Sequence, residues 1–172
     1  YNIPTVALRF FNVYGTRQAL SNPYTGVLAI FASRLLNNRP PLIYEDGLQK
    51  RDFVNVRDVV QACRLAIETP GVAGETFNIG SGNAYTVREL GERMAAVLGK
   101  QDIVPQITGK YRAGDIRHCF ADITKARQML DYQPRVTLEE GLGELVAWLS
   151  DQIAVDQVEQ ANYELAQRGL TV

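Results

Sequence analysis

The sequence is poor in the residues that bind metals or form disulfide bridges. It contains one histidine, His118, and two cysteines, Cys63 and Cys119, which lie far apart and form no Cys-x-x-Cys pair. This argues against a structural zinc site, and we predict no metal site. Isolated thiols are typical of a protein that is kept reduced in the cytoplasm, where we expect this one to be found.

Long hydrophobic runs are also absent. No stretch reaches the roughly 18 consecutive apolar residues of a transmembrane helix, so the sequence predicts none. The chain starts at Tyr1 with neither a basic segment nor an apolar signal core. We expect its 172 residues, enough for one domain, to be part of a longer protein.

Neither sign of charge is in excess. The chain has 18 basic and 19 acidic residues, for a net charge of -1, and the basic residues do not cluster. This argues against nucleic acid or a membrane surface as a partner. Any anion site must therefore be a local arrangement of a few arginines.

Several catalytic and nucleotide-binding motifs do not occur. The sequence has no Gly-x-Gly-x-x-Gly fingerprint, no Walker loop and no Gly-x-Ser-x-Gly elbow. The nearest approach, Gly80-Ser81-Gly82, lacks the third glycine and is interpreted as a plain turn. His118 and Cys119 are adjacent in sequence, an arrangement that rarely makes a nucleophile and its base, so a structural role is favoured.

What the sequence does contain is an alternation of short strands and helices. Apolar runs predict strands at 5–11, 42–44, 52–56, 75–79 and 104–108, the first of them buried on both faces. Helical periodicity predicts helices at 27–38, 57–69, 86–98, after Asp122, after Thr137 and at 155–167. Thr86 with Glu89 and Thr137 with Glu140 have the spacing of capping boxes. Residues 12–26 and 110–119 are predicted loops, and the whole pattern is typical of an α/β fold.

Residues 49–60 (QKRDFVNVRDVV) are central to this organisation. A polar turn gives way to an alternating run, typical of a half-buried strand, that passes directly into a helix. Arg51 is thereby predicted at the edge of a strand-to-helix corner, where a fixed guanidinium can face a pocket. An isolated arginine is more often a solvated turn residue, so other motifs must decide between the two interpretations.

Five short motifs follow one another in a consistent order. They are RFFNVYG at 9–15, RDFVNVRDV at 51–59, FNIGSG at 77–82 with TVREL at 86–90, RAGD at 112–115, and ADITKA at 121–126. Together they resemble the C-terminal portion of an extended short-chain dehydrogenase/reductase, in the subgroup of NAD-dependent nucleotide-sugar epimerases and dehydratases. The 18–26 loop and the run at 42–47 are most similar to those of UDP-glucose and dTDP-rhamnose 4-epimerases.

The resemblance implies a C-terminal part of an extended Rossmann-type fold, with residues 1–172 forming mainly the smaller substrate-binding lobe. Family members carry a glycine-rich NAD loop and a Tyr-x-x-x-Lys catalytic pair upstream of RFFNVYG. Neither is found here. Tyr1 does not begin such a pair, because Thr5 stands where the lysine would be required. The expectation is a fragment without catalytic residues of its own and without activity alone. The whole protein is expected to be an NAD-dependent homodimer.

The same resemblance implies a site for a nucleoside diphosphate sugar such as a UDP- or dTDP-hexose. Arg51 and Arg112 would bind the phosphates, with an amide hydrogen bond from Asn12, and arginine suits this because its planar fork presents fixed donors. Asp115 would accept from the ribose. The remaining residues implied are Val27 lining the pocket, Leu42 and Tyr44 bordering the base, Cys119 near the sugar C2 substituent, and Phe10, whose backbone would pass the nicotinamide.

Three functions stay open from the sequence. The first is a nucleotide-sugar 4-epimerase, in which NAD takes a hydride from sugar C4 and returns it to the other face. The second is a dehydratase or reductase of the same family, because the nucleotide-holding residues are shared. The third is a non-catalytic nucleotide-sugar binding domain, and for the RAGD segment alone a tight turn with a local salt bridge is the simpler interpretation.

Overall fold

Parallel strand pairs form the backbone of the structure, a computed structural model that describes residues 1–18, 26–150, 163 and 166–169. β1 (Ala7–Phe10) pairs with β6 (Thr76–Ile79), β2 (Asn12–Tyr14) with β5 (Phe53–Asn55), and β3 (Leu42–Ile43) with β8 (Gln106–Ile107), all in parallel. A mixed three-stranded sheet has the order β7 (Tyr85–Thr86), β4 (Lys50–Arg51), β9 (His118–Cys119). The predicted α/β class is confirmed.

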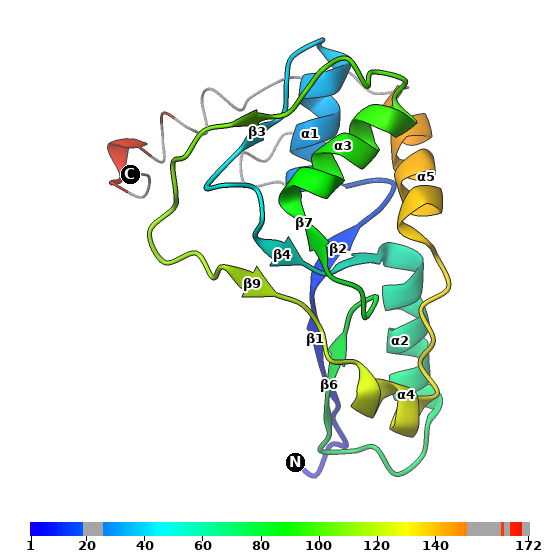
Figure 1. Cartoon of the computed structure of the whole chain (residues 1–172). Coiled ribbons are helices and arrows are strands. Elements are labelled where there is room, and N and C mark those ends of the chain that lie inside the picture. The colour runs from blue at the N-terminus through cyan, green and yellow to red at the C-terminus, as the bar shows by residue number, and fades with distance from the viewer. Residues whose placement is uncertain (19–25, 151–162, 164–165, 170–172) are drawn as a thin grey trace.

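Five helices cover these strands in the described residues. They are α1 (Val27–Leu36), α2 (Val56–Glu68), α3 (Val87–Val97), α4 (Thr124–Leu130) and α5 (Leu138–Ser150). Figure 1 shows α1, α3 and α5 grouped at one end of the molecule, while α2 and α4 lie beside β6 at the end that holds the N-terminus. Most of the final helix predicted at 155–167, and most of the predicted 18–26 loop, lie outside the described residues.

The two groups of helices enclose two hydrophobic clusters that meet at β5. Phe53 packs with α1, α3 and α5, whereas Val54 packs with α2, α4 and β6. Phe53, Val54 and Asn55 are all buried, so the prediction of a half-buried strand at 52–56 is wrong. Successive side chains do point to opposite faces of this strand, but each face is covered by one of the two clusters.

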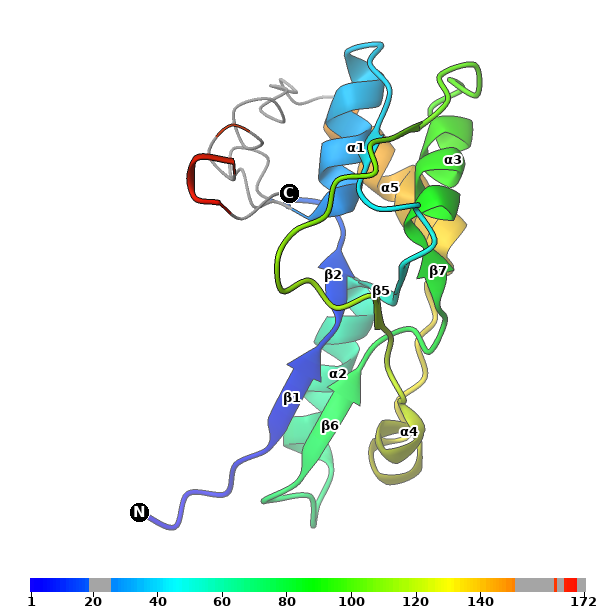
Figure 2. The ribbon, with the colours of Figure 1, turned by 60° about the vertical axis from the view of Figure 1, so that its left-hand side comes forward.

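The first strand was predicted to be buried on both faces, and this prediction is also wrong. Leu8 is partly buried against the second cluster, but Ala7, Arg9 and Phe10 are exposed. In the described part of the chain β1 has one strand partner, β6, and Figure 2 shows helix α2 behind one face of this pair. Its other face and its free edge are therefore open.

The predicted loop at 12–26 begins later than expected. Residues 12–14 form strand β2, in register with β5, and Tyr14 is 3% exposed in the core, edge-on to Phe53 at 6.4 Å between ring centroids. Asn12 and Gly15 suggested a loop, but pairing with β5 outweighs this weak local preference.

Both predicted capping boxes are confirmed. Thr86 Oγ1 accepts a hydrogen bond from Glu89 N at 3.1 Å while Glu89 Oε2 accepts from Thr86 N at 2.7 Å. Thr137 and Glu140 make the same reciprocal pair at the start of α5. Side chains that satisfy the free N–H groups of a helix define where it begins.

Candidate functional site

Arg51 lies in β4, between β7 and β9, rather than at a strand-to-helix corner as predicted. The corner is at Asn55, whose side chain accepts from Arg57 N and caps α2. The Arg51 guanidinium donates to the carbonyl oxygens of Arg117 at 2.8 Å and Ile116 at 2.6 Å, and to its own neighbour Lys50. Arg51 is therefore fastened to the segment that joins β8 to β9.

Arg112 lies in that same segment. Its guanidinium carbon is 5.0 Å from the centroid of the Tyr44 ring, a cation–π geometry. Its Nε is buried and has no hydrogen-bond partner among the described residues. An unpaired buried donor is costly and uncommon in folded proteins.

The RAGD segment forms the tight turn that the simpler interpretation predicted. Asp115 N donates to Arg112 O at 3.2 Å, and Gly114 has a φ of +86°. The salt bridge of that interpretation is not found in the part of the chain that the structure describes, and Asp115 is exposed. Its carboxylate is therefore accessible to a hydroxyl donor.

The other predicted site residues lie on neighbouring elements. Leu42 is in β3, and Tyr44 follows it directly, so these two and Arg112 share one region. Cys119 pairs in register with Arg51 across β4 and β9. Phe10 ends β1 and is 48% exposed, and Asn12 begins β2, where its N–H donates to Asp52 O at 3.1 Å.

Val27 is the first residue of α1, after Gly26, and packs partly against the first cluster. The helix has no side-chain cap and no acidic residue in its first turn. The partial positive charge of this helix end is therefore not neutralised by α1 itself, which favours an anion nearby. The residues before Gly26 lie outside the described part, so this end carries no further argument.

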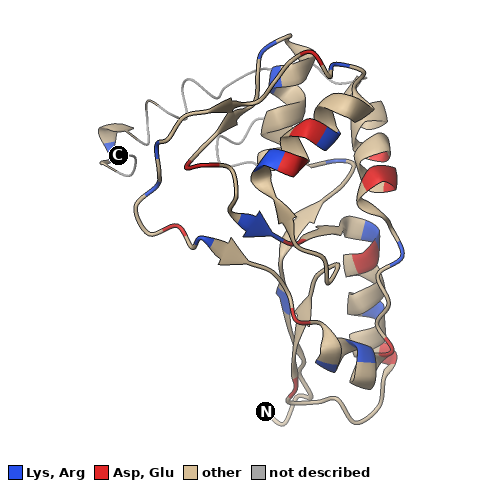
Figure 3. Ribbon diagram, in the orientation of Figure 1, with Lys and Arg blue, Asp and Glu red and all other residues tan. Residues whose placement is uncertain are grey.

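Basic residues concentrate around this region. Figure 3 shows Lys and Arg on β4 and along the arc that joins β8 to β9, which stands away from the helices. These residues are Lys50, Arg51, Lys110, Arg112 and Arg117. Glu45 and Asp46 face the last of them, Arg117, whose guanidinium binds both carboxylates. The arginine holds the pKa of Asp46 well below its usual range, at about 2.

A buried carboxylate that the sequence interpretation missed holds this region together. Asp52 is fully buried, and it accepts hydrogen bonds from Ser81 N and Oγ at 2.7 Å each, from Gly82 N at 3.0 Å and from Ala121 N at 3.3 Å. One side chain thus joins the end of β4, the turn after β6 and the chain after β9. A lone aspartate in an apolar run was the available signal, since a buried charge requires several donors.

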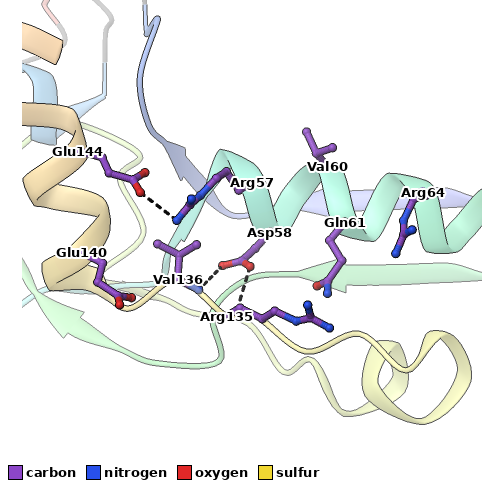
Figure 4. Close-up of a pocket in the computed structure, with 9 residues that line it drawn as sticks. All are labelled: Arg57, Asp58, Val60, Gln61, Arg64, Arg135, Val136, Glu140 and Glu144. Atoms are coloured by element: carbon purple, nitrogen blue, oxygen red, sulfur yellow. Dashed lines mark hydrogen bonds and ion pairs between the residues drawn. The ribbon is translucent and has the colours of Figure 1, made fainter.

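A groove of about 570 Å³ lies elsewhere, between α2 and the start of α5 (Figure 4). Arg57 pairs with Glu144 at 2.9 Å, and Asp58 accepts from the backbone N–H groups of Arg135 and Val136. Its lining, among the residues the structure describes, includes none of the predicted site residues. These polar contacts explain the groove as a structural junction.

The described residues contain neither a metal-binding cluster nor a membrane-spanning helix. No group of three His, Cys, Asp or Glu side chains there could hold a metal ion. No helix among them combines the length and apolar character needed to cross a membrane. Both cysteines are free thiols.

Parallel strands with covering helices, and a segment that places Arg112 over the Tyr44 ring, characterise this α/β protein. Comparison with known proteins identifies the class as NAD-dependent nucleotide-sugar epimerases and dehydratases of the short-chain dehydrogenase/reductase fold. Residues 1–145 match the family model described as GDP-mannose 4,6 dehydratase, and the chain belongs to that family.

Individual relatives agree. The chain is 38% identical over 151 residues to the dTDP-L-rhamnose 4-epimerase of Burkholderia thailandensis, covering 87% of this chain and 41% of that protein. A UDP-glucose 4-epimerase from Thermotoga maritima, solved with UDP-glucose, superposes with a TM-score of 0.78 at 40% identity, covering 87% of this chain and 47% of that one. The UDP-glucuronic acid 4-epimerase of Bacillus cereus, solved with UDP-glucuronic acid and NAD, superposes with a TM-score of 0.77 at 30% identity, covering 86% and 46%. The chain thus spans less than half the length of these relatives.

Proposed function

We propose that this chain is the nucleotide-binding portion of an NAD-dependent nucleotide-sugar 4-epimerase, and that it holds the nucleoside diphosphate of the substrate. The observation that carries the proposal is Arg112, which lies over Tyr44 with a buried, unpaired Nε–H. A diphosphate oxygen would accept from the guanidinium of Arg112. Hydrogen bonds of this charge-assisted kind contribute about 1.5–3 kcal/mol each.

Arg51 supports the same site from the other strand. Its contacts with Ile116 and Arg117 bring it against the segment that carries Arg112 and Asp115. In the proposal Arg51 and Arg112 bind the diphosphate with help from Asn12, Asp115 accepts from the ribose, and Leu42 and Tyr44 border the base. Val27 contributes backbone at the start of α1.

The proposal assigns NAD to the whole protein, with little of its binding site in this chain. The sequence has no glycine-rich dinucleotide loop and no Tyr-x-x-x-Lys pair, and Phe10, exposed at the end of β1, is the one residue predicted to approach the cofactor. NAD would supply the hydride acceptor for sugar C4. The proposed role of this chain is to bind the nucleotide, which is remote from the reacting carbon. The binding energy of the nucleotide then positions the reacting sugar. The chain alone is therefore expected to be inactive.

Titration of the chain with nucleotides by calorimetry tests the proposal. UDP or dTDP should bind about tenfold or more tightly than UMP, because the second phosphate adds charge-assisted hydrogen bonds. Arg112→Ala and Arg51→Lys should weaken UDP binding by a similar factor and UMP binding less. Arg93→Ala, which removes an exposed ion pair with Glu139, is the control and should change neither. Equal affinities for UDP and UMP would contradict the proposal.

Cys119 provides a finer test of the substrate. A residue of this size beside the sugar C2 position leaves room for an N-acetyl group, so the intact enzyme should accept both UDP-glucose and UDP-N-acetylglucosamine. A strong preference against the acetylated sugar would show that Cys119 does not have this role.

The second candidate function is a nucleotide-sugar dehydratase, which the description of the matching family model favours. The nucleotide-holding residues would serve either reaction. NMR of the sugar produced by the intact protein separates the two, since a 4-epimerase inverts C4 and a 4,6-dehydratase eliminates water. In a non-catalytic binding domain the sugar would remain unchanged. In either enzyme the whole protein is proposed to be a cytoplasmic homodimer, and the free thiols support a reducing compartment.

A further inference from the structure

Arg117 makes a contact that neither the motifs nor the proposed binding site explains. Its Nη1 lies 2.6 Å from Glu45 Oε2 and its Nη2 lies 2.7 Å from Asp46 Oδ2, so one guanidinium joins two adjacent carboxylates. More than 70 residues separate it from each partner along the chain. The contact therefore fixes the end of the β8–β9 segment against the turn that follows β3.

The turn that receives Arg117 is itself well anchored. Asp46 Oδ1 accepts from Leu48 N at 2.9 Å, and Asp46 O accepts from Arg88 Nη2 at 2.9 Å. Arg88 belongs to α3, whose inner face lies in the first hydrophobic cluster. The turn that carries the carboxylates is thus tied to α3, and through α3 to the core of the molecule.

Apolar packing contributes little to the position of residues 110–117. Tyr111 is 50% exposed and Ile116 is 65% exposed. The segment is instead tied by polar contacts at both ends: Lys110 O accepts from Glu45 N at 2.7 Å, and Arg117 binds the carboxylates while its carbonyl accepts from Arg51. An exposed ion pair alone is worth little, but a network of several charges contributes more.

Arg112 and Asp115 lie between these two ties, and Tyr44 immediately precedes Glu45. Displacement of the segment would move Arg112 off the Tyr44 ring and would carry Asp115 with it. We propose that Arg117 is a positioning residue, which with Glu45 and Asp46 latches the 110–117 segment over the nucleotide site. The expected effect of this latch on nucleotide binding rests on the proposed function, whereas the existence of the latch does not.

A competing role for Arg117 is direct binding of phosphate, and the two roles predict opposite results for the carboxylates. If Arg117 is a latch, removing the charges of Glu45 and Asp46 frees the segment and weakens nucleotide binding. If Arg117 is a phosphate ligand, the same change releases its guanidinium and strengthens binding. The double variant Glu45→Gln with Asp46→Asn keeps both shapes and distinguishes the roles.

The latch is tested on the chain without nucleotide by amide hydrogen exchange. In Arg117→Gln and in the double variant, the amides of Glu45 and Asp115, bonded to Lys110 O and Arg112 O, should exchange at least about fivefold faster than in the unmodified chain. Arg93→Gln, which breaks the comparable Glu139 pair on α3, should leave them unchanged. Unchanged exchange in both test variants would overturn the latch.

Calorimetry with UDP tests the consequence. Both test variants should raise the Kd for UDP about three- to tenfold, and high salt should reduce the difference because it screens exposed pairs. Tighter binding by the double variant, or an unchanged Kd in both, would overturn the positioning role. Failure of the unmodified chain to bind UDP would overturn the proposed function instead, and the exchange result would still decide whether the latch exists.

Discussion

The helical end of the molecule, formed by α1, α3 and α5, and the 110–117 segment are held by different forces. Where α1, α3 and α5 meet, side chains such as Phe31, Leu90 and Leu142 are at most 1% exposed and pack in one cluster. Around Arg112, by contrast, hydrogen bonds and ion pairs fasten a segment whose apolar side chains face solvent. The first region should respond to changes of volume and the second to changes of charge, and this separation can be tested.

The largest effect is expected in the helical end. Leu142→Ala should lower the free energy of unfolding by about 2–5 kcal/mol, because it leaves a cavity among fully buried neighbours. Leu48→Ala, at a position 48% exposed in the turn that contains Asp46, should cost well under half as much. Urea unfolding followed through Trp148 fluorescence measures both. Similar losses for the two variants would mean that apolar packing also holds the site region.

The region around Arg51 and Arg112 also depends on one buried charged side chain, that of Asp52. Asp52→Asn should cost about 2–4 kcal/mol, because its amide cannot accept from both Ser81 and the N–H groups of Gly82 and Ala121. Asp122→Asn is the matched exposed control and should cost much less, because its carboxylate faces solvent. Denaturant unfolding compares them. Equal stabilities would show that Asp52 is not required to join the three segments.

A smaller effect should come from the capping box of α3. Thr86→Ala removes the hydroxyl that accepts from Glu89 N and should cost about 1 kcal/mol, whereas Thr86→Ser retains an acceptor and should cost less. UDP affinity should change little in either variant, since the Thr86 hydroxyl bonds to Glu89 of α3 and not to β4, although Thr86 itself lies in β7 beside β4. A loss of affinity in Thr86→Ala alone would show that the two regions are coupled.

The smallest effect should appear in acid. Hydrogen bonds from Arg117 and, to a smaller extent, from the Leu48 amide lower the pKa of Asp46 to about 2 in the folded chain. In the unfolded chain the pKa is about 3.9, so on acidification the unfolded chain binds this proton first. The stabilising effect is therefore complete above pH 4 and is lost as the pH falls toward 2. The groups facing Asp46 are Arg117, its neighbour Glu45 and Arg88.

Urea midpoints measured from pH 5 to pH 2 should thus fall less steeply in Asp46→Asn than in the unmodified chain. Glu89 and Glu140, whose pKa values are lowered by their capping partners, remain in both proteins and make the shared background. Parallel curves would indicate that Arg117 does not stabilise the charged form of Asp46.

Local sequence was a good guide to the helices and a poorer one to the strands. The Thr86–Glu89 and Thr137–Glu140 boxes are contacts between residues three apart, so spacing alone predicts them. The burial of β1 and β5 was predicted wrongly, because the exposure of a strand depends on which elements cover its two faces. Local sequence predicts a loop at 12–14, where the structure has a strand, because the pairing residues of β5 lie about 40 positions away.

The site shows the same division. Motif order alone pointed to Arg51, Arg112 and Asp115, and the structure brings Arg51 against the segment that carries the other two. Asp52 and Arg117 were missed, since each acts on residues about 30 to 72 positions away. A buried acceptor or an ion pair can be recognised only when its partners are known.

By itself, the order of residues determined the α/β class, the start points of the capped helices and the set of arginines available to an anion, because these depend on composition and on short spacings. Only the tertiary structure decided that the Arg112 Nε–H is buried and unpaired, that Asp52 joins three segments and that Arg117 ties the 110–117 segment to the turn after β3. Each of these depends on distances between residues remote in sequence, which folding sets and no local pattern encodes.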